Sequence, residues 1–183
     1  MGDSFMKTNV RRLVYLAIFC AISVVLIYVI HLPLFPAAPF LEYDPADVPL
    51  LLSGFMFGPV WGLLTTIVAC AVQATTVSAG SGIIGFFMHV FATGVYVLVA
   101  ATIYHFSKKS IGATIAALLA ATLAATAMMI PLNLIFTPMY GTPIQAVRDM
   151  MWTVIVPFNL IKFSMNSVIT ALLYRLLRRF LKG

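Results

Sequence analysis

The chain has 183 residues, of which 62% are hydrophobic and only 9% are charged. A soluble globular domain carries roughly 25% charged residues, so this composition excludes an ordinary soluble fold. The mean hydropathy of +1.07 predicts an all-α integral membrane protein instead. The formal net charge is +6, but the basic residues lie at the ends of apolar segments, which is typical of membrane topology rather than of nucleic-acid binding.

Apolar segments predict the helices in chain order, because about 20 residues of α-helix cross a bilayer. The first such segment shows no clear cleavage site, so we expect it to be a retained span. Residues 32–47 contain four prolines, which exclude a regular helix and predict a structured outer loop. Asp47 is expected to cap the next helix, with Pro49 in its first turn. The expected spans are 10–30, 48–57, 60–77, 86–106, 111–136 and 150–173.

Gly58 and Pro59 interrupt the apolar residues 48–77, which therefore form either one kinked span or a hairpin of two. The positive-inside rule favours the hairpin, because nine of the eleven lysines and arginines then lie on the cytoplasmic side with both termini. We therefore expect a six-helix bundle that forms a single membrane-embedded domain over residues 1–183. In this topology Glu42, Asp44 and Asp47 are expected outside.

The sequence offers little support for a catalytic or cofactor-binding site. The glycines of AGSGIIG, at 80, 82 and 85, match a dinucleotide-binding spacing, but they join two predicted spans instead of following a strand. We expect them to form a flexible loop over an outward-facing cavity. The sequence has no P-loop, and its histidines and its two cysteines, Cys20 and Cys70, have no metal-ligand spacing. We therefore expect no enzyme activity, no metal and no cofactor.

The last predicted span contains a lysine in an apolar setting. Asn159, Lys162 and Asn166 are spaced i, i+3 and i+7, so they share one helical face. A charge at a helix centre costs about 2.5–3.5 kcal/mol on insertion scales. The basic end of the helix is roughly 20 Å away, too far for the lysine to reach the interface. Lys162 is therefore expected to face a protein interior or a wet cavity, on a face that continues outward over Ile155, Trp152 and Arg148.

Because no acidic residue is expected deep within a span, carbonyls, amides, water or a ligand are the expected partners of Lys162. Asn133 follows Pro131 near the outer end of its span and offers both a donor and an acceptor. A lysine and asparagines suit the polar edge of a flat heterocycle. The aromatic residues that would stack on it also lie on the outer side: Phe40, Tyr43, Phe136, Tyr140 and Trp152. His89 is either a hydrogen-bonded packing residue or a ligand contact.

Over nearly its whole length, the sequence resembles the substrate-binding (S) components of energy-coupling factor (ECF) vitamin transporters, and among them the riboflavin-specific members. The resemblance is carried by LEYDPADVPLLLSGFMFGPVWG at 41–62, by GSGIIGFFMHVFATG at 80–94, by PLN at 131–133 and by FNLIK at 158–162. It implies six helices in a prokaryotic plasma membrane. It also implies that riboflavin is the transported ligand.

The resemblance assigns roles to individual residues. Asn133, Asn159 and Lys162 are implied to hydrogen-bond the flavin, and the loop formed by Phe40, Leu41, Glu42 and Tyr43 to close over it. His89 and Trp152 complete the expected binding site, although asparagine would be expected at position 89. Ala17 and Ala21 are implied to dock onto a transmembrane coupling (T) protein, which works with two cytoplasmic ATPases.

The sequence leaves other functions open. Folate, thiamine, FMN or another flavin stay open as ligands of such a component, because pocket residues differ among these subgroups. An intramembrane enzyme would need a nucleophile or metal cluster at membrane depth. A structural membrane subunit would not need Asn159 and Lys162 in its core.

Overall fold

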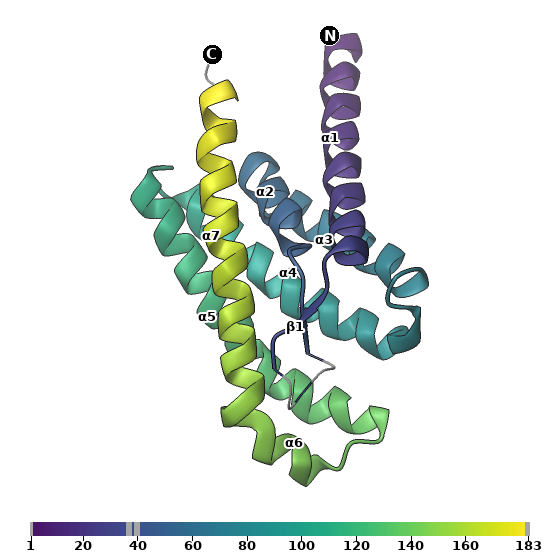
Figure 1. Ribbon diagram of the computed structural model, residues 1–183. Coiled ribbons are helices and arrows are strands. Elements are labelled where there is room, and N and C mark those ends of the chain that lie inside the picture. The colour runs from purple at the N-terminus through teal and green to yellow at the C-terminus, as the bar shows by residue number, and fades with distance from the viewer. Residues whose placement is uncertain (1, 36–37, 39–40, 182–183) are drawn as a thin grey trace.

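The computed structural model describes residues 2–35, 38 and 41–181, and the side chains of residues 9–35, 38 and 41–177. Its helices are α1 (Gly2–Val29), α2 (Asp47–Phe57), α3 (Pro59–Thr75), α4 (Gly82–Phe106), α5 (Ile111–Phe136), α6 (Ile144–Met150) and α7 (Val156–Leu181) (Figure 1). Short turns lie between them: the 3₁₀ turns η1 (Ala79–Ser81) and η2 (Thr137–Tyr140) and the π-helical turn η3 (Met151–Ile155). The predicted helical fold is confirmed.

The predicted loop between α1 and α2 contains a short antiparallel pair, β1 (Leu32–Pro33) and β2 (Glu42–Tyr43). Leu32 pairs with Tyr43, and Pro33 with Glu42. The prolines of this segment prevent helix formation, and the paired strands return the chain to the bundle at the start of α2.

Among the described residues, four helical stretches are long and apolar enough to cross a membrane: Asn9–Val29, Ala79–Phe106, Ile111–Tyr140 and Ile144–Leu177. The helices α2 and α3 are apolar but shorter, with 11 and 17 residues. The start of α1 and the end of α7 lie at the same end of the bundle, and α6 lies at the opposite end (Figure 1).

Glycines let α2 fold back against α3. Gly58 separates the two helices with a φ of +104°, a conformation that favours glycine, and its N–H bonds to the Gly54 carbonyl at 2.9 Å. A Cβ added to Gly62 would lie 2.7 Å from the Gly54 Cα and 2.8 Å from the Val97 Cγ1. The two helices therefore pack backbone to backbone, as a hairpin and not as one kinked helix.

Substitution of Gly62 by alanine should lower the free energy of unfolding by about 1–3 kcal/mol, because the new methyl group overlaps backbone that cannot move aside. Thermal unfolding of the detergent-solubilised protein measures this loss. Gly112→Ala is the matched control, since its Cβ would meet only the Ser110 Oγ at 3.9 Å. Equal melting temperatures for the two variants would contradict the close packing of α2 on α3.

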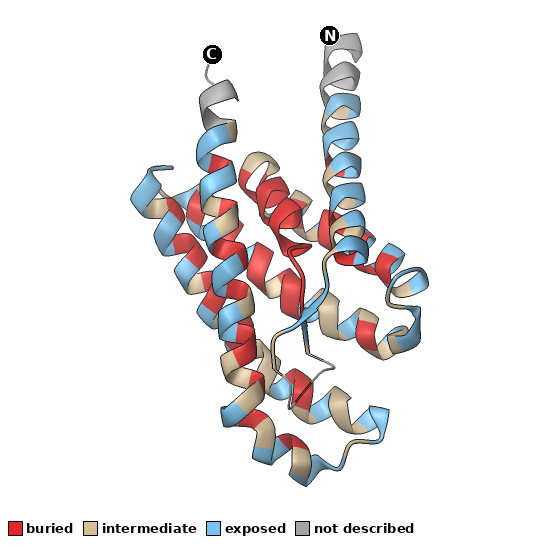
Figure 2. Ribbon diagram, in the orientation of Figure 1, coloured by how far each residue is buried: buried red, intermediate tan, exposed pale blue. Residues whose placement is uncertain are grey.

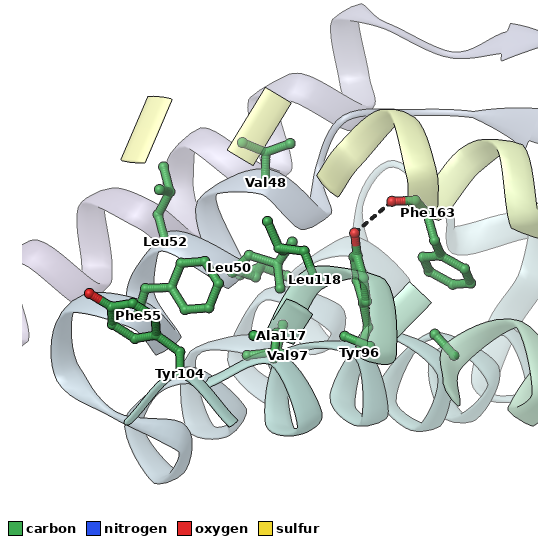
Figure 3. Packing of buried hydrophobic residues seen from close by; sticks show 14 of the residues in the cluster. Val48, Leu50, Leu52, Phe55, Tyr96, Val97, Tyr104, Ala117, Leu118 and Phe163 are labelled. Carbon is green, nitrogen blue, oxygen red and sulfur yellow. Dashed lines mark hydrogen bonds between the residues drawn. The ribbon is translucent and has the colours of Figure 1, made fainter. Parts of the chain in front are cut away.

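The core lies where α2, α4, α5 and α7 meet (Figure 3). Tyr96 is fully buried, and its hydroxyl donates to the Phe163 carbonyl at 2.7 Å. The alanines of α5 at 117, 121 and 125 are also fully buried, so small residues bring α5 close to its neighbours.

One face of α1 stays outside this core. Figure 2 shows that most of the described part of α1 is exposed. Ala17 and Ala21 lie on this exposed face together with the large apolar side chains of Ile18, Ile22 and Val25. The face is apolar, as expected for a helix that contacts lipid or another membrane protein.

Candidate ligand-binding site

The segment before α2 is inserted between α1 and α7. Residues 43–47 are all buried. The Ser23 hydroxyl of α1 donates to the Ala46 carbonyl at 2.8 Å, and the Asn166 amide of α7 donates to the Asp44 carbonyl at 3.2 Å. The Asp44 carboxylate accepts from the Ala46 N–H at 3.0 Å and closes the turn. The end of the segment is thereby tied to both flanking helices.

A buried ion pair joins this segment to α7. The Lys162 Nζ donates to the Asp44 Oδ2 at 2.6 Å, and the two side chains are only 12% and 8% exposed. Burial alone would raise the pKa of the Asp44 carboxyl, but the Lys162 ammonium and the hydrogen bond from it outweigh burial and hold that pKa below its usual range. The prediction that Lys162 has no acidic partner is therefore wrong, because Asp44 is not outside the bundle.

A second carboxylate lies beside the pair. Asp47 is 5% exposed and accepts from the Thr93 hydroxyl at 2.9 Å and from the Asn166 amide at 3.0 Å. The N-cap position of α2 belongs to Ala46, without a side-chain hydrogen bond. The predicted capping role of Asp47 is therefore wrong, and its carboxylate lies buried within the bundle. Its hydrogen bonds instead connect α2 to α4 and α7.

A cavity of about 470 Å³ opens next to these charges. Residues of the α1–α2 segment, α2, η1, α4, α5, η2 and α7 line it. Of the predicted ligand-binding residues, the lining includes Leu41, Glu42, His89, Asn133, Asn159 and Lys162. Residues far apart in the sequence thus meet around one hollow. Its volume is in the range of small-molecule sites.

The glycine motif borders this cavity, but its residues form the turn η1 and the start of α4 instead of the predicted loop. Gly80, Ser81 and Gly85 are among its lining residues. The Tyr140 hydroxyl of η2 donates to the Ser81 carbonyl at 2.9 Å and links the turn before α4 to the end of α5. A Cβ on Gly85 would overlap the Ser81 side chain, so glycine permits this close turn.

The two predicted asparagines are oriented by their own helices. The Asn133 amide donates to the Met129 carbonyl at 2.8 Å, and its oxygen accepts from the Thr137 hydroxyl at 3.0 Å. The Asn159 amide donates to the Ile155 carbonyl at 2.8 Å. Each amide nitrogen carries a second N–H, so each fixed side chain retains a donor for a ligand in the cavity.

Most of the remaining lining is formed by apolar and hydroxyl side chains that were not among the predicted ligand contacts. They are Met88, Ala92, Thr93, Met129, Thr137, Phe158 and Phe163, with Asp47 from α2. The Phe158 ring contacts the Phe35 ring edge-on, with centroids 6.2 Å apart. Helical spacing could have found Thr93, which lies one turn after His89, whereas the phenylalanines read as ordinary apolar residues.

Some predicted aromatic contacts lie elsewhere. Tyr43 is 5% exposed beside Asp44 and is not part of the cavity lining. Phe136 packs against the hydrophobic core instead. Phe40 lies outside the described residues.

Trp152 is the largest error in the predicted site, because its side chain is 71% exposed and absent from the lining. The prediction assumed a regular α-helix, but η3 is a π-helical turn in which the Val156 N–H donates to the Met151 carbonyl. The extra residue rotates the preceding chain, so Val147 and Met151 are buried at 0% and 4% while Trp152 and Arg148 face outward.

A second hollow of about 350 Å³ adjoins the cavity. Glu42, His89 and Lys162 line both spaces. Asp44 lines only the smaller one, with Ile27, His31, Val77 and Ser78. The Lys162 side chain therefore stands between the cavity and its acidic partner.

A family model for the substrate-specific component of ECF transporters matches residues 11–174. The chain belongs to this family. The riboflavin transporter RibU of Staphylococcus aureus is 33% identical over 180 residues, which cover 94% of this chain and 93% of that protein. RibU of Streptococcus thermophilus is 29% identical over 187 residues, which cover 97% and 88%.

The fold of this S component agrees with a solved structure. The S component of a bacterial ECF transporter matches it with a TM-score of 0.82 and 32% sequence identity, over 96% of this chain and 99% of that one. The chain is therefore a multi-pass protein of the plasma membrane, as the resemblance implied. The resemblance to ECF S components is confirmed.

Proposed function

We propose that this S component binds riboflavin outside the cell and delivers it inward together with a coupling protein and two ATPases. One observation carries the proposal most directly: Asn133, Asn159 and Lys162 converge on a single cavity that is otherwise mainly apolar. The similarity to two riboflavin transporters over most of the chain supports the same ligand.

The chemistry of the cavity suits a flavin. The isoalloxazine ring is flat and apolar on its faces, and carbonyls and ring nitrogens alternate along its pyrimidine edge. Phe158, Phe163 and Met129 offer apolar contacts to the faces. The Lys162 ammonium and the asparagine amides offer donors to the edge. Riboflavin is uncharged, so Lys162 keeps Asp44 as its counter-ion when the ligand binds.

The remaining roles follow from position. Leu41 and Glu42 line the cavity from the α1–α2 segment, so this segment covers the bound ligand. Ala17 and Ala21 would contact the coupling protein, because they lie on the exposed face of α1. In this account both termini are cytoplasmic, the domain comprises the whole chain, and the S component itself carries out no chemistry.

Mass spectrometry of the small molecule that co-purifies with the protein tests the proposal. We expect riboflavin, and we expect riboflavin to raise the melting temperature of ligand-free protein more than FMN, folate or thiamine does, because a ligand stabilises the folded state by mass action. Stabilisation by folate or thiamine alone would assign a different vitamin. Folded protein that responds to none of the four would contradict vitamin binding.

A further inference from the structure

We propose that Asp44 is a positioning residue for ligand binding, because it holds the Lys162 ammonium at the wall of the cavity although it does not line the cavity itself. The inference rests on the proposed binding of riboflavin and extends it to a residue outside the pocket. It concerns the buried ion pair at 2.6 Å, in which one partner lines the cavity and the other lines only the adjoining hollow.

Asp44 is itself held in place. One carboxylate oxygen accepts from the Ala46 N–H at 3.0 Å, and the other accepts from Lys162 at 2.6 Å. Its backbone carbonyl accepts from the Asn166 amide at 3.2 Å. A rotation of the carboxylate would break the turn before α2, so the position of the acceptor for Lys162 is fixed by the fold.

The lysine depends on this anchor. A lysine side chain has four flexible methylene torsions, and ordering it costs conformational entropy. The bond to Asp44 meets part of this cost before a ligand arrives, and it uses one of the three N–H donors of the ammonium. The other N–H groups remain for a carbonyl in the cavity. Asp44 should therefore affect affinity only through Lys162.

The other acidic groups nearby do not replace Asp44. Both carboxylate oxygens of Asp47 accept hydrogen bonds, from Thr93 and from Asn166. Glu42 lines the cavity but is exposed, and no ion pair joins it to Lys162 in the described part of the chain. Among the acidic residues whose side chains the structure describes, Asp44 alone combines burial with direct contact to the ammonium.

A double-mutant cycle on riboflavin affinity tests the inference. Asp44→Asn keeps an oxygen for the Ala46 N–H but replaces the acceptor of Lys162, and Lys162→Met removes the ammonium while keeping an unbranched chain. We expect Lys162→Met to weaken binding by about 10- to 100-fold, as for the loss of a charged hydrogen bond. We expect Asp44→Asn to weaken it about tenfold when Lys162 is present, and less than twofold in the Lys162→Met background. Asp149→Asn, at an exposed carboxylate on α6, should leave affinity unchanged.

The outcomes separate this inference from the proposed function. Failure of the unmodified protein to bind riboflavin would overturn both. Normal binding, with an equal tenfold loss from Asp44→Asn in both backgrounds, would overturn only the positioning role, because Asp44 would then act through the fold. If Asp44→Asn alone does not fold, the comparison of Lys162→Met with the double variant still decides, since the double variant has lost both charges of the pair. A further tenfold loss in that comparison would overturn the inference.

Discussion

Replacing Lys162 with methionine should lower the free energy of unfolding by about 3–5 kcal/mol, besides weakening riboflavin binding. The reason is the Asp44 carboxylate, which is only 8% exposed and would lose its counter-ion. Removing one partner of a buried ion pair leaves an uncompensated charge, and such losses are among the largest that single substitutions cause. Unfolding of the ligand-free protein in mixed detergent micelles measures the difference.

Two controls make this prediction specific. Lys108→Met removes an exposed lysine after α4 and should change the free energy of unfolding by less than about 0.5 kcal/mol. Combining Lys162→Met with Asp44→Asn should recover most of the lost stability, because neither charge remains. If Lys162→Met were as stable as Lys108→Met, the ion pair would contribute nothing to folding, and the account of the site would be wrong on this point.

Replacing Asn166 with leucine should cost about 3 kcal/mol of stability. Asn166 is fully buried, and its amide donates to both the Asp44 carbonyl and the Asp47 carboxylate. Leucine is similar in size but offers no donor, so two buried acceptors would each lose a hydrogen bond at about 1–3 kcal/mol. Chemical or thermal unfolding of the purified variant measures the cost.

Thr170→Val is the matched control for Asn166→Leu. Thr170 lies one turn further along α7 and is also fully buried, but its hydroxyl has no hydrogen-bond partner among the described residues. Replacing this hydroxyl with a methyl group should therefore be neutral or stabilising. A Thr170→Val variant as unstable as Asn166→Leu would indicate that the cost comes from packing on this face of α7 and not from the hydrogen bonds.

The helical periodicity of α7 explains why part of the site was predictable. From Val156 onward α7 is continuous, so the spacing of Asn159, Lys162 and Asn166 places them on one face as expected. Asn159 and Lys162 line the cavity, and Asn166 bonds to the inserted segment below it. The lysine itself also indicated a polar interior, because a charged side chain in lipid has a high energetic cost.

The position of the acidic residues could not be derived from local sequence. Prolines show that residues 32–47 are not a helix, but they do not show how deep the chain returns into the bundle. Asp44 and Asp47 therefore read as outer-loop charges, although tertiary contacts with Ser23, Asn166 and Thr93 place this segment inside. Only the folded structure shows that the lysine has a carboxylate partner.

The misplacement of Trp152 has a local cause. Pro157 lacks an N–H, so the Thr153 carbonyl loses the donor that a regular α-helix would provide. The chain adopts the π-helical turn η3 just before this proline, so the helical face that carries Asn159 and Lys162 does not continue to Trp152. The sequence shows the proline, and a proline predicts a disturbed helix. It does not predict in which direction the chain before it is rotated.

We expect riboflavin to bind between the α1–α2 segment, α4, α5 and α7. An experimental structure of the protein determined with saturating riboflavin tests this most directly. We expect the flavin ring in the cavity against Phe158, with its polar edge within hydrogen-bond distance of Asn133, Asn159 and Lys162, and with the Lys162–Asp44 pair intact. Riboflavin bound elsewhere, or a filled cavity in which none of these three side chains contacts the ring, would contradict it.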